Sequence, residues 1–395
     1  MLEVSAALEI VLGRTQRLKA VTVPLNQAAL GRVVAADIAS DIDSPPYAKS
    51  VMDGYAIRSD DTATNLAVIE EVAAGRMPTR TVAPGQAARV MTGAPIPDGA
   101  DAVIPHEETK VSGDRVEICR PVARGKFILP RAKEMRAGEV VIPAGTKLTP
   151  AVFGLLSAVG RTDVSVYPAP RLAIISTGDE LVEPLVRPGP GQIRNTNGPM
   201  LAALTARAGA EARYLGIARD DKTGLEKLVR DGLEHSEVLV LSGGVSAGKY
   251  DFVPDVLRES GVEAHFHKVR MKPGKPLLFG TRGETLVFGL PGNPVSSFVG
   301  FELFVRPTLR KMSGEAIPGP TFVPVPLAEN LTTDNDRPTF APATLQWTSE
   351  GLRVSPAGWF GSADLRGLLN TDALISLPAG AVAYASGFSV PTLPL

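Results

Sequence analysis

Cysteine is nearly absent from this sequence: Cys119 is the single one among 395 residues. One cysteine cannot form a disulfide within the chain, which fits the reducing conditions of the cytoplasm, where structural disulfides are rare. It also excludes a zinc site built from several cysteines. We therefore expect a cytoplasmic protein.

An excess of either charge is also missing, because 41 basic residues face 42 acidic ones. A general binder of nucleic acid or of a membrane surface would show a basic excess, so neither partner is expected. The balance leaves room for a local anion site.

No uninterrupted apolar stretch reaches the length of a membrane span. The closest one, residues 285–305, is broken by the sequence PGNP, whereas a transmembrane helix needs about 20 consecutive apolar residues. The first residues, MLEVSAALEIVLGRT, have no basic start and no unbroken apolar core, so no signal peptide is predicted. The spacing of Val4, Leu8 and Val11 predicts an amphipathic helix there.

The chain is too long for one hydrophobic core, and its pattern changes along its length. Residues 1–44 predict helical segments, and Thr149-Pro150 opens a later helix. Short apolar runs between Gly/Pro turns in residues 45–134 predict an all-β module. From about residue 166, apolar strands alternate with helices, which predicts a mostly parallel α/β sheet. Residues 318–395 return to short strands, a small β domain.

Four loops follow strands of the predicted α/β sheet: residues 176–181, 219–221, 242–251 and 290–297. Such sheets bind ligands at the carboxyl ends of their strands, so these loops should gather at one edge. The glycines of SGGVSAGKYD allow backbone N–H groups to approach an anion. Carboxylates beside an anion make sense if a magnesium ion bridges the two. The loops offer Asp179, Glu180, Asp220, Asp221 and Ser246.

Each feature also has a simpler interpretation. A Gly-Gly pair after a strand is often only a turn, and the sequence RDD can cap the next helix. Gly243 to Lys249 match a P-loop, but the next residue is Tyr250 instead of Ser or Thr, so a working P-loop is not expected. Lys272 and Lys275, around a Pro-Gly turn, would hold one anion or form a solvated corner.

Eight segments then form a recognisable set in one order: SVMDGYAIRSDD, RVMTGAPIPDGADAVIPHEE, STGDEL, GQIRNTNGPML, GIARDD, LSGGVSAGKYDF, MKPGKPLLFG and GLPGNPVSSF. The sequence closely resembles the molybdopterin molybdenumtransferases, MoeA-type enzymes related to the E domain of gephyrin. The match runs from about residue 5 to 310 and continues weakly to the C-terminus.

This resemblance implies a fold and a reaction. The fold would be multidomain α/β plus β, with a discontinuous helical linker domain (1–45 and 135–165), a β module (46–134), an α/β molybdopterin-binding domain (166–317) and a small C-terminal β domain (318–395). The reaction would insert molybdate into the dithiolene of adenylylated molybdopterin, with Mg²⁺, releasing AMP and molybdenum cofactor. The resemblance further implies a homodimer, with an active cleft between the α/β domain of one subunit and the β module of its partner, and contact with the adenylylating enzyme of the pathway.

Site roles carry over by motif. The implied catalytic residues are Asp53, Thr92, Glu180 and Asp251, and the implied metal ligands are Glu180, Asp220 and Asp251. The implied binding residues are Ser242, Gly243, Gly244, Ser246, Asp220, Lys272, Lys275, Pro291, Pro294, Ser296 and Ser362.

Two stretches depart from the family pattern. The pattern G-x-N-V-R-x-x-G-E-D is replaced by GKFILPRAKE, so that Phe127 stands for Asn and Ala132 for Gly. In the C-terminal domain Pro342 stands where a family arginine follows an aromatic residue, and Arg337 is the nearby substitute. These departures leave one alternative, a divergent paralogue that binds molybdopterin or acts as a scaffold without turnover.

Overall fold

The computed structural model describes residues 1–219, 221–244, 252–358 and 360–395. The chain folds into two compact units. The first unit contains residues 1–35, 145–149 and 163–395, and the second contains residues 36–144 and 150–162. No helix in these described ranges is long and apolar enough to cross a membrane.

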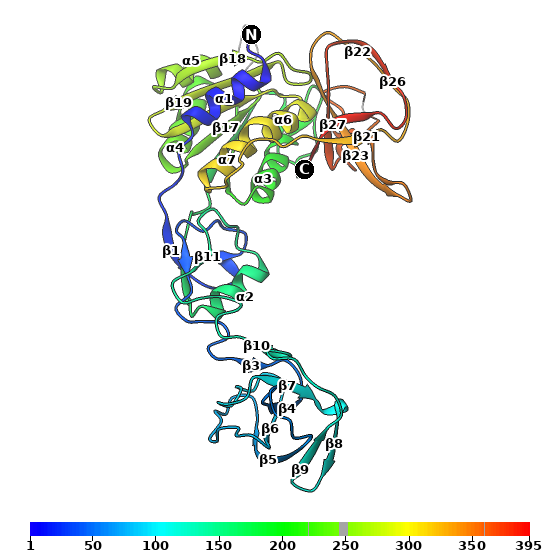
Figure 1. Ribbon diagram of the computed structural model, residues 1–395. Helices are drawn as coiled ribbons and strands as arrows, with labels where there is room; N and C mark the ends of the chain where they lie inside the picture. The colour runs from blue at the N-terminus through cyan, green and yellow to red at the C-terminus, as the bar shows by residue number, and fades with distance from the viewer. Residues whose placement is uncertain (220, 245–251, 359) are drawn as a thin grey trace. The chain divides into compact units, whose positions relative to one another are not determined.

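The first unit is built on a six-stranded sheet with the order β16-β13-β17-β20-β19-β18 (Figure 1). The first four strands are parallel, and β19 and β18 are antiparallel additions at one edge. This confirms the mostly parallel sheet that the sequence predicts. The strands are β13 (Arg171–Thr177), β16 (Glu211–Ala218), β17 (Val238–Ser242), β18 (Glu263–Lys268), β19 (Pro276–Arg282) and β20 (Thr285–Leu290).

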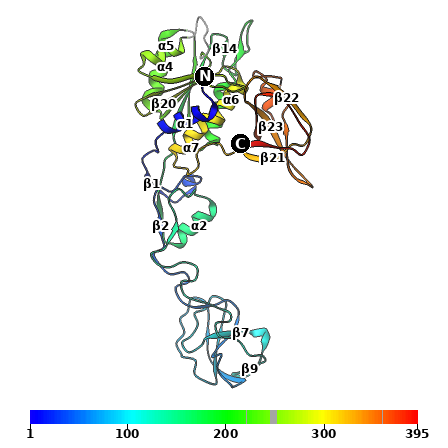
Figure 2. The same cartoon turned by 45° about the horizontal axis from the view of Figure 1, so that its top comes forward.

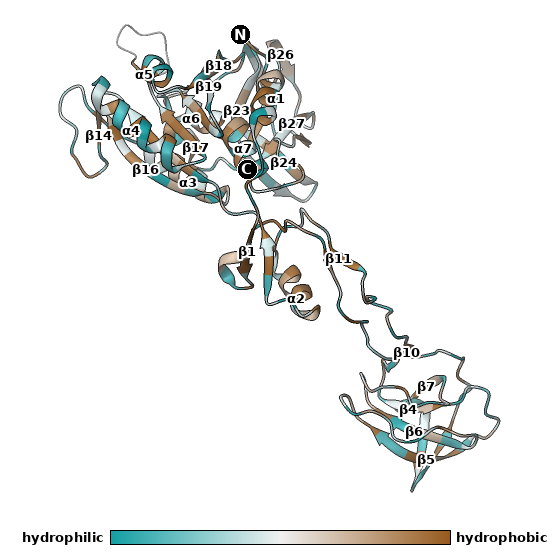
Figure 3. Cartoon of the chain, turned by 90° about the vertical axis from the view of Figure 1, so that its left-hand side faces the viewer, coloured by the Kyte–Doolittle hydropathy of each residue, from teal (hydrophilic) through white to brown (hydrophobic). Residues whose placement is uncertain are grey.

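Helices cover both faces of this sheet, because neighbouring strand residues point to opposite sides. Leu172 and Ile174 of β13 belong to one core, while Ala173 and Ile175 belong to the other. The first four residues of the buried strand β17, residues 238–241, are hydrophobic, whereas α4 carries hydrophilic residues (Figure 3). The first face is covered by α1 (Val4–Arg14), α3 (Asn197–Arg207), α6 (Pro294–Gly300), the π-helical turn η3 (Phe301–Val305) and α7 (Arg306–Met312), and the second by α4 (Lys222–His235) and α5 (Val253–Glu259).

The N-terminal segment contains less helix than the sequence predicts. Only α1 and the short η1 (Gln27–Ala29) are helical before residue 45, and β1 (Val21–Pro24) pairs with β12 (Asp163–Val166). The expectation of helical segments over residues 1–44 is therefore confirmed for the amphipathic helix at Val4–Arg14 and wrong for most of residues 15–44. Helix α1 buries Ala7 and Val11 in a core of the α/β sheet, so tertiary packing places it with the sheet instead of in a separate helical domain.

A projecting arm, residues 181–194, leaves the α/β sheet after β13 (Figure 2). Its two short strands, β14 (Leu181–Val182) and β15 (Ile193–Arg194), pair in parallel. Leu185, near the middle of the arm, is fully exposed.

The C-terminal residues form the small β domain that the sequence predicts. A five-stranded sheet has the order β21-β27-β25-β23-β24, and β22 pairs with β26 beside it. Its strands are β21 (Val323–Pro326), β22 (Leu331–Asn335), β23 (Thr339–Thr348), β24 (Gly351–Pro356), β25 (Ala373–Leu377), β26 (Gly380–Tyr384) and β27 (Ser389–Pro394), with the short helix η4 (Leu365–Leu368).

The second unit is mainly β structure, as expected for residues 45–134. A six-stranded sheet has the order β7-β4-β6-β5-β9-β8, and its helix α2 starts at Pro150, as the sequence predicts. The elements are β2 (Ile38–Ala39), β3 (Lys49–Ser50), β4 (Gly54–Ile57), β5 (Asn65–Val72), β6 (Gln86–Val90), β7 (Ala102–Pro105), η2 (His106–Glu108), β8 (Thr109–Ser112), β9 (Arg115–Ile118), β10 (Ile128–Leu129), β11 (Val140–Ile142) and α2 (Pro150–Ala158).

Candidate functional site

The carboxyl ends of β13, β17 and β20 meet at one edge of the sheet. Ser176 lies opposite Ser242, and Ser242 lies opposite Leu290. A cavity of about 980 Å³, the sheet-edge cavity, opens here, at the edge where open α/β sheets bind ligands. Its described lining residues are Ser176, Thr177, Gly178, Glu180, Leu181, Pro188, Gln192, Ile193, Arg194, Asn195, Thr196, Asn197, Ser242, Gly243, Gly244, Pro276, Pro291, Gly292, Asn293, Pro294, Ala363 and Leu365.

The glycine pair after β17 is required by geometry. Gly243 has φ +94° and Gly244 has φ +63°, both in the left-handed region that side chains disfavour. A Cβ atom on Gly243 would lie 2.6 Å from the carbonyl oxygen of Thr177. The Gly243 N–H is held by the Leu290 carbonyl at 3.0 Å, which fixes the turn between two strand ends.

Buried polar side chains join three of the loops around the cavity. Asn197 Nδ2 donates to Ser242 Oγ and to the Gly292 carbonyl, each at 2.7 Å. Ser297 Oγ donates to the Pro291 carbonyl and lies 3.5 Å from Ser242 Oγ. The start of α3, the end of β17 and the LPGNP segment are therefore locked to one another.

The C-terminal domain reaches the same cavity through Ser362. Asn293 Nδ2 donates to Ser362 Oγ at 2.7 Å, and the Val295 N–H donates to the Ser362 carbonyl at 3.1 Å. Ala363 and Leu365, in the same loop, line the cavity. The segments around Asn293 and Ser362, which are 69 residues apart in sequence, thus form one wall of the cavity.

Comparison with known proteins identifies the family. Residues 2–160 match the family model of the MoeA N-terminal region (domain I and II), residues 173–311 a probable molybdopterin binding domain, and residues 324–395 the MoeA C-terminal region (domain IV). The chain is 38% identical over 383 residues to a molybdopterin molybdenumtransferase of Nostoc sp., covering 93% of this chain and 87% of that protein. This chain belongs to the molybdopterin molybdenumtransferase family.

Other members of the molybdopterin molybdenumtransferase family are similar to this chain over nearly its full length. The enzyme of Staphylococcus aureus is 32% identical over 394 residues, covering 98% of this chain and 94% of that protein. A crystal structure of the molybdopterin biosynthesis MoeA protein of Pyrococcus horikoshii has a TM-score of 0.85 and 33% identity, with full coverage of both chains. The multidomain α/β plus β fold is therefore that of the family.

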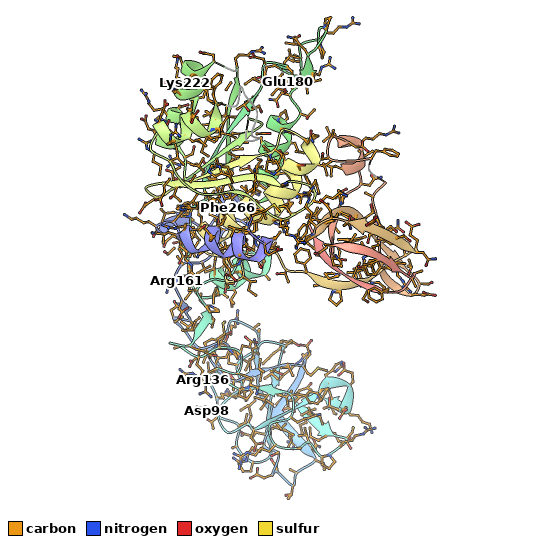
Figure 4. The ribbon with its side chains drawn as sticks, turned by 90° about the horizontal axis from the view of Figure 1, so that it is seen from above. Asp98, Arg136, Arg161, Glu180, Lys222 and Phe266 are labelled. Carbon is orange, nitrogen blue, oxygen red and sulfur yellow. The ribbon has the colours of Figure 1, made fainter. Side chains whose placement is uncertain are left out.

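Five of the ten predicted binding residues in the α/β domain line the sheet-edge cavity, and so does the predicted metal ligand Glu180. The structure places Glu180, Ser242, Gly243, Gly244, Pro291 and Pro294 in its lining. Figure 4 shows Glu180 at the base of the arm. Ser296 is buried in the first turn of α6 and does not line the cavity.

Lys272 and Lys275 lie beside the cavity rather than in its described lining. The Lys272 N–H donates to the Pro338 carbonyl at 2.8 Å, so this segment joins the C-terminal domain. Lys272 is half-buried and Lys275 exposed, and neither has a carboxylate within ion-pair distance among the described residues. Arg337, next to Pro338, has its Nε atom buried without a hydrogen-bond partner in the described part of the chain.

Asp53 and Thr92 meet in the second unit. The Thr92 N–H donates to Asp53 Oδ1 at 2.6 Å, and Thr92 Oγ1 donates to the same oxygen at 2.8 Å. These two hydrogen bonds hold the pKa of the Asp53 carboxyl below its usual value, and the bond from the Thr92 backbone N–H has the larger effect. The structure therefore brings these two predicted catalytic residues together, with Thr92 stabilising the ionised carboxylate of Asp53.

Three predicted residues, Asp220, Ser246 and Asp251, lie outside the described residues. Within the described ranges, no group of three or more His, Cys, Asp or Glu side chains is arranged to hold a metal ion. Asp221, the neighbour of Asp220, caps α4 by accepting from the N–H groups of Thr223 and Gly224. The capping interpretation of RDD is therefore confirmed for this residue.

The sequence did not single out several residues of the site. Asn195 Oδ1 accepts from Ser176 Oγ at 3.0 Å and from the Gly198 N–H at 3.1 Å. Asn195 Nδ2 donates to the hydroxyl of Tyr214 at 2.6 Å. The signal was the polar segment RNTN directly before α3, which carried the family resemblance without suggesting a role for any one residue.

Proposed function

We propose that this chain inserts molybdate into the dithiolene of adenylylated molybdopterin and releases AMP and molybdenum cofactor. The sheet-edge cavity, bordered by the KPGKP segment and closed on one wall by the C-terminal domain, carries the proposal. Full-length relatives named molybdopterin molybdenumtransferase support it. The glycine turn at Gly243 and Gly244 would allow a phosphate of the ligand to approach the backbone.

The cations at the junction of the α/β and C-terminal domains suit an oxyanion. Lys272 is held to the C-terminal domain by two backbone hydrogen bonds, its N–H to Pro338 and its carbonyl from the Phe340 N–H. Arg337 precedes Pro338, and its Nε donor is buried. Arg337 would therefore supply the guanidinium of the family arginine, whose position is held here by Pro342 of β23. Lysines hold an anion as point charges and an arginine adds a planar fork of donors, a combination that suits a molybdate dianion.

Mg²⁺ belongs to the proposal as the cofactor. Glu180 has its carboxylate at the cavity and no ion-pair partner among the described residues, and carboxylate oxygens suit this hard cation. Glu180 would hold the ion together with Asp220 and Asp251. When bound, Mg²⁺ neutralises charge on the pyrophosphate that is cleaved.

The assembly is also part of the proposal. A homodimer in the cytoplasm that receives its substrate from the adenylylating enzyme follows from the family resemblance alone. Light scattering of the purified chain tests the dimer, and a mass of a single 41.5 kDa chain would contradict it.

The reaction is tested with purified protein, adenylylated molybdopterin, Mg²⁺ and molybdate. We expect AMP and a cofactor that activates an apo-molybdoenzyme, both dependent on molybdate. Lys272→Gln should raise the molybdate concentration needed for half-maximal AMP release, and Lys268→Gln, an exposed lysine at the end of β18, should not. Absence of both AMP and active cofactor with the wild-type protein would refute the proposed function.

A further inference from the structure

The arm, residues 181–194, forms one wall of the sheet-edge cavity. Leu181, Pro188, Gln192, Ile193 and Arg194 all line it. Glu180 and Arg194 are the two charged side chains among the described lining residues. Arg194 is therefore the one described cation in a cavity for which the proposed function requires a strongly anionic ligand.

Arg194 is available for such a ligand. Its side chain is exposed, and no carboxylate lies within ion-pair distance of it in the described part of the chain. Glu180 lies close along the paired strands, since the Ile193 N–H donates to the Glu180 carbonyl, yet the two side chains form no ion pair. An arginine in a cavity wall without a carboxylate partner keeps all five donors for a phosphate.

A hydrogen-bond network, buried at Asn195, fixes the backbone next to this arginine. Asn195, the next residue, is 2% exposed and bonds to Ser176 and to the hydroxyl of Tyr214. Tyr214 in turn donates at 3.0 Å to Oε1 of Glu183, the residue that follows β14 in the arm. Burial and the Glu183 carboxylate raise the pKa of Tyr214 to about 12, so the hydroxyl keeps its proton. The residue after each strand of the arm is thus tied to the sheet, Glu183 after β14 and Asn195 after β15.

We propose that Arg194 binds a phosphate group of the substrate in the sheet-edge cavity, and that Tyr214 is a positioning residue that holds the arm in place for this contact. The inference rests on the proposed function, because it takes the anionic ligand from there. The phosphate is either the pyrophosphate of the adenylylated ligand or the phosphate that molybdopterin itself carries. The two sources share one chemistry, and different ligands distinguish them.

The test compares Arg194→Gln with Arg187→Gln in AMP release from adenylylated molybdopterin. Arg187 is an exposed arginine on the same arm that does not line the cavity, so it is the matched control. For Arg194→Gln we expect a KM raised about tenfold at low salt, the effect of one lost charge-assisted hydrogen bond. The value of kcat should stay near wild type, because a uniform binding contact is lost. Arg194→Lys should recover part of the affinity, and Arg187→Gln should match wild type.

Tyr214→Phe removes only the hydroxyl and retains Arg194. Like Arg194→Gln, this variant should have a raised KM. Hydrogen exchange of residues 181–194 should become faster in this variant if the hydroxyl holds the arm. A variant with normal exchange and normal KM would overturn the positioning role.

Ligand binding separates the sources. Equal losses of affinity of Arg194→Gln for molybdopterin and for its adenylylated form point to the phosphate of molybdopterin, and a loss confined to the adenylylated form points to the pyrophosphate. If the wild-type protein releases no AMP, the proposed function itself is refuted. If the wild-type protein is active but Arg194→Gln and Arg187→Gln have the same KM, whether raised or unchanged, this inference alone is overturned.

Discussion

Ala132→Gly should stabilise the protein, although replacing alanine with glycine usually does the opposite. Ala132 has φ +56°, and its N–H is held by the Pro45 carbonyl at 3.0 Å, so the segment keeps it in the left-handed region. That conformation costs an L-residue about 1–2 kcal/mol, and glycine avoids the cost. Glycine also gains freedom in the unfolded chain, which offsets about 0.5–1 kcal/mol. The balance is a gain of roughly 0.5–1 kcal/mol in the free energy of unfolding.

Ala137→Gly is the matched control. Ala137 lies five positions further on, is exposed, and has no positive φ, since Phe127 and Ala132 are the two non-glycine residues with positive φ in the described ranges. This change should lower the free energy of unfolding by about 0.5–1 kcal/mol, so the two substitutions have opposite signs.

Calorimetry of both variants measures the effect. The second unit should melt about 1–4 °C higher with Ala132→Gly and lower with Ala137→Gly. Urea unfolding followed by near-ultraviolet circular dichroism supplies an independent midpoint. A lower melting temperature for Ala132→Gly, equal to that of the control, would refute the argument from backbone strain.

Three further predictions concern other parts of the chain. Gly243→Ala should destabilise the first unit by at least about 2 kcal/mol and abolish AMP release, because a Cβ would lie 2.6 Å from the Thr177 carbonyl oxygen; normal turnover would contradict this. Glu302→Gln should cost about 3–5 kcal/mol in urea unfolding, because a fully buried carboxylate bonds two arginines; a loss below 1 kcal/mol would be inconsistent with that pairing. Because the pKa of Asp53 is lower in the folded protein, its contribution to stability is present above the usual Asp pKa of 3.8 and is lost as pH falls through the lower folded pKa. Thr92→Val should shrink this acid-dependent part in a pH titration of unfolding, and an unchanged titration would count against the hydrogen bond.

Local patterns predicted the α/β domain well. The strand Val238–Ser242 is buried at every position and apolar over residues 238–241, and the helix that starts at Asn197 follows a polar segment. Such elements are specified by sequence, because burial on both faces requires apolar residues at every position. The glycine turn after the strand was visible for the same reason: two adjacent glycines mark a backbone that side chains would exclude.

Tertiary contacts explain what the sequence did not give. Helix α1 has an amphipathic pattern that predicts a helix but not its partner, and only the core around Val11 shows that it packs on the α/β sheet. The two-residue strands of the arm are too short for any periodicity. Asn195 is an ordinary polar residue in sequence, and its role arises because Ser176 and Tyr214, 19 residues away on either side, converge on it.

The departure at residues 125–134 places two bulkier residues in the left-handed region of the backbone. Phe127 and Ala132, which stand where the family pattern has Asn and Gly, both have φ +56°, a conformation that Asn and Gly favour. Hydrogen bonds hold both positions, since the Phe127 carbonyl accepts from the Val51 N–H at 3.1 Å. The cost of the two replacements therefore falls on the stability of the second unit. All described lining residues of the sheet-edge cavity belong to the first unit, so this departure lies outside the glycine turn, the arm and the Ser362 contact.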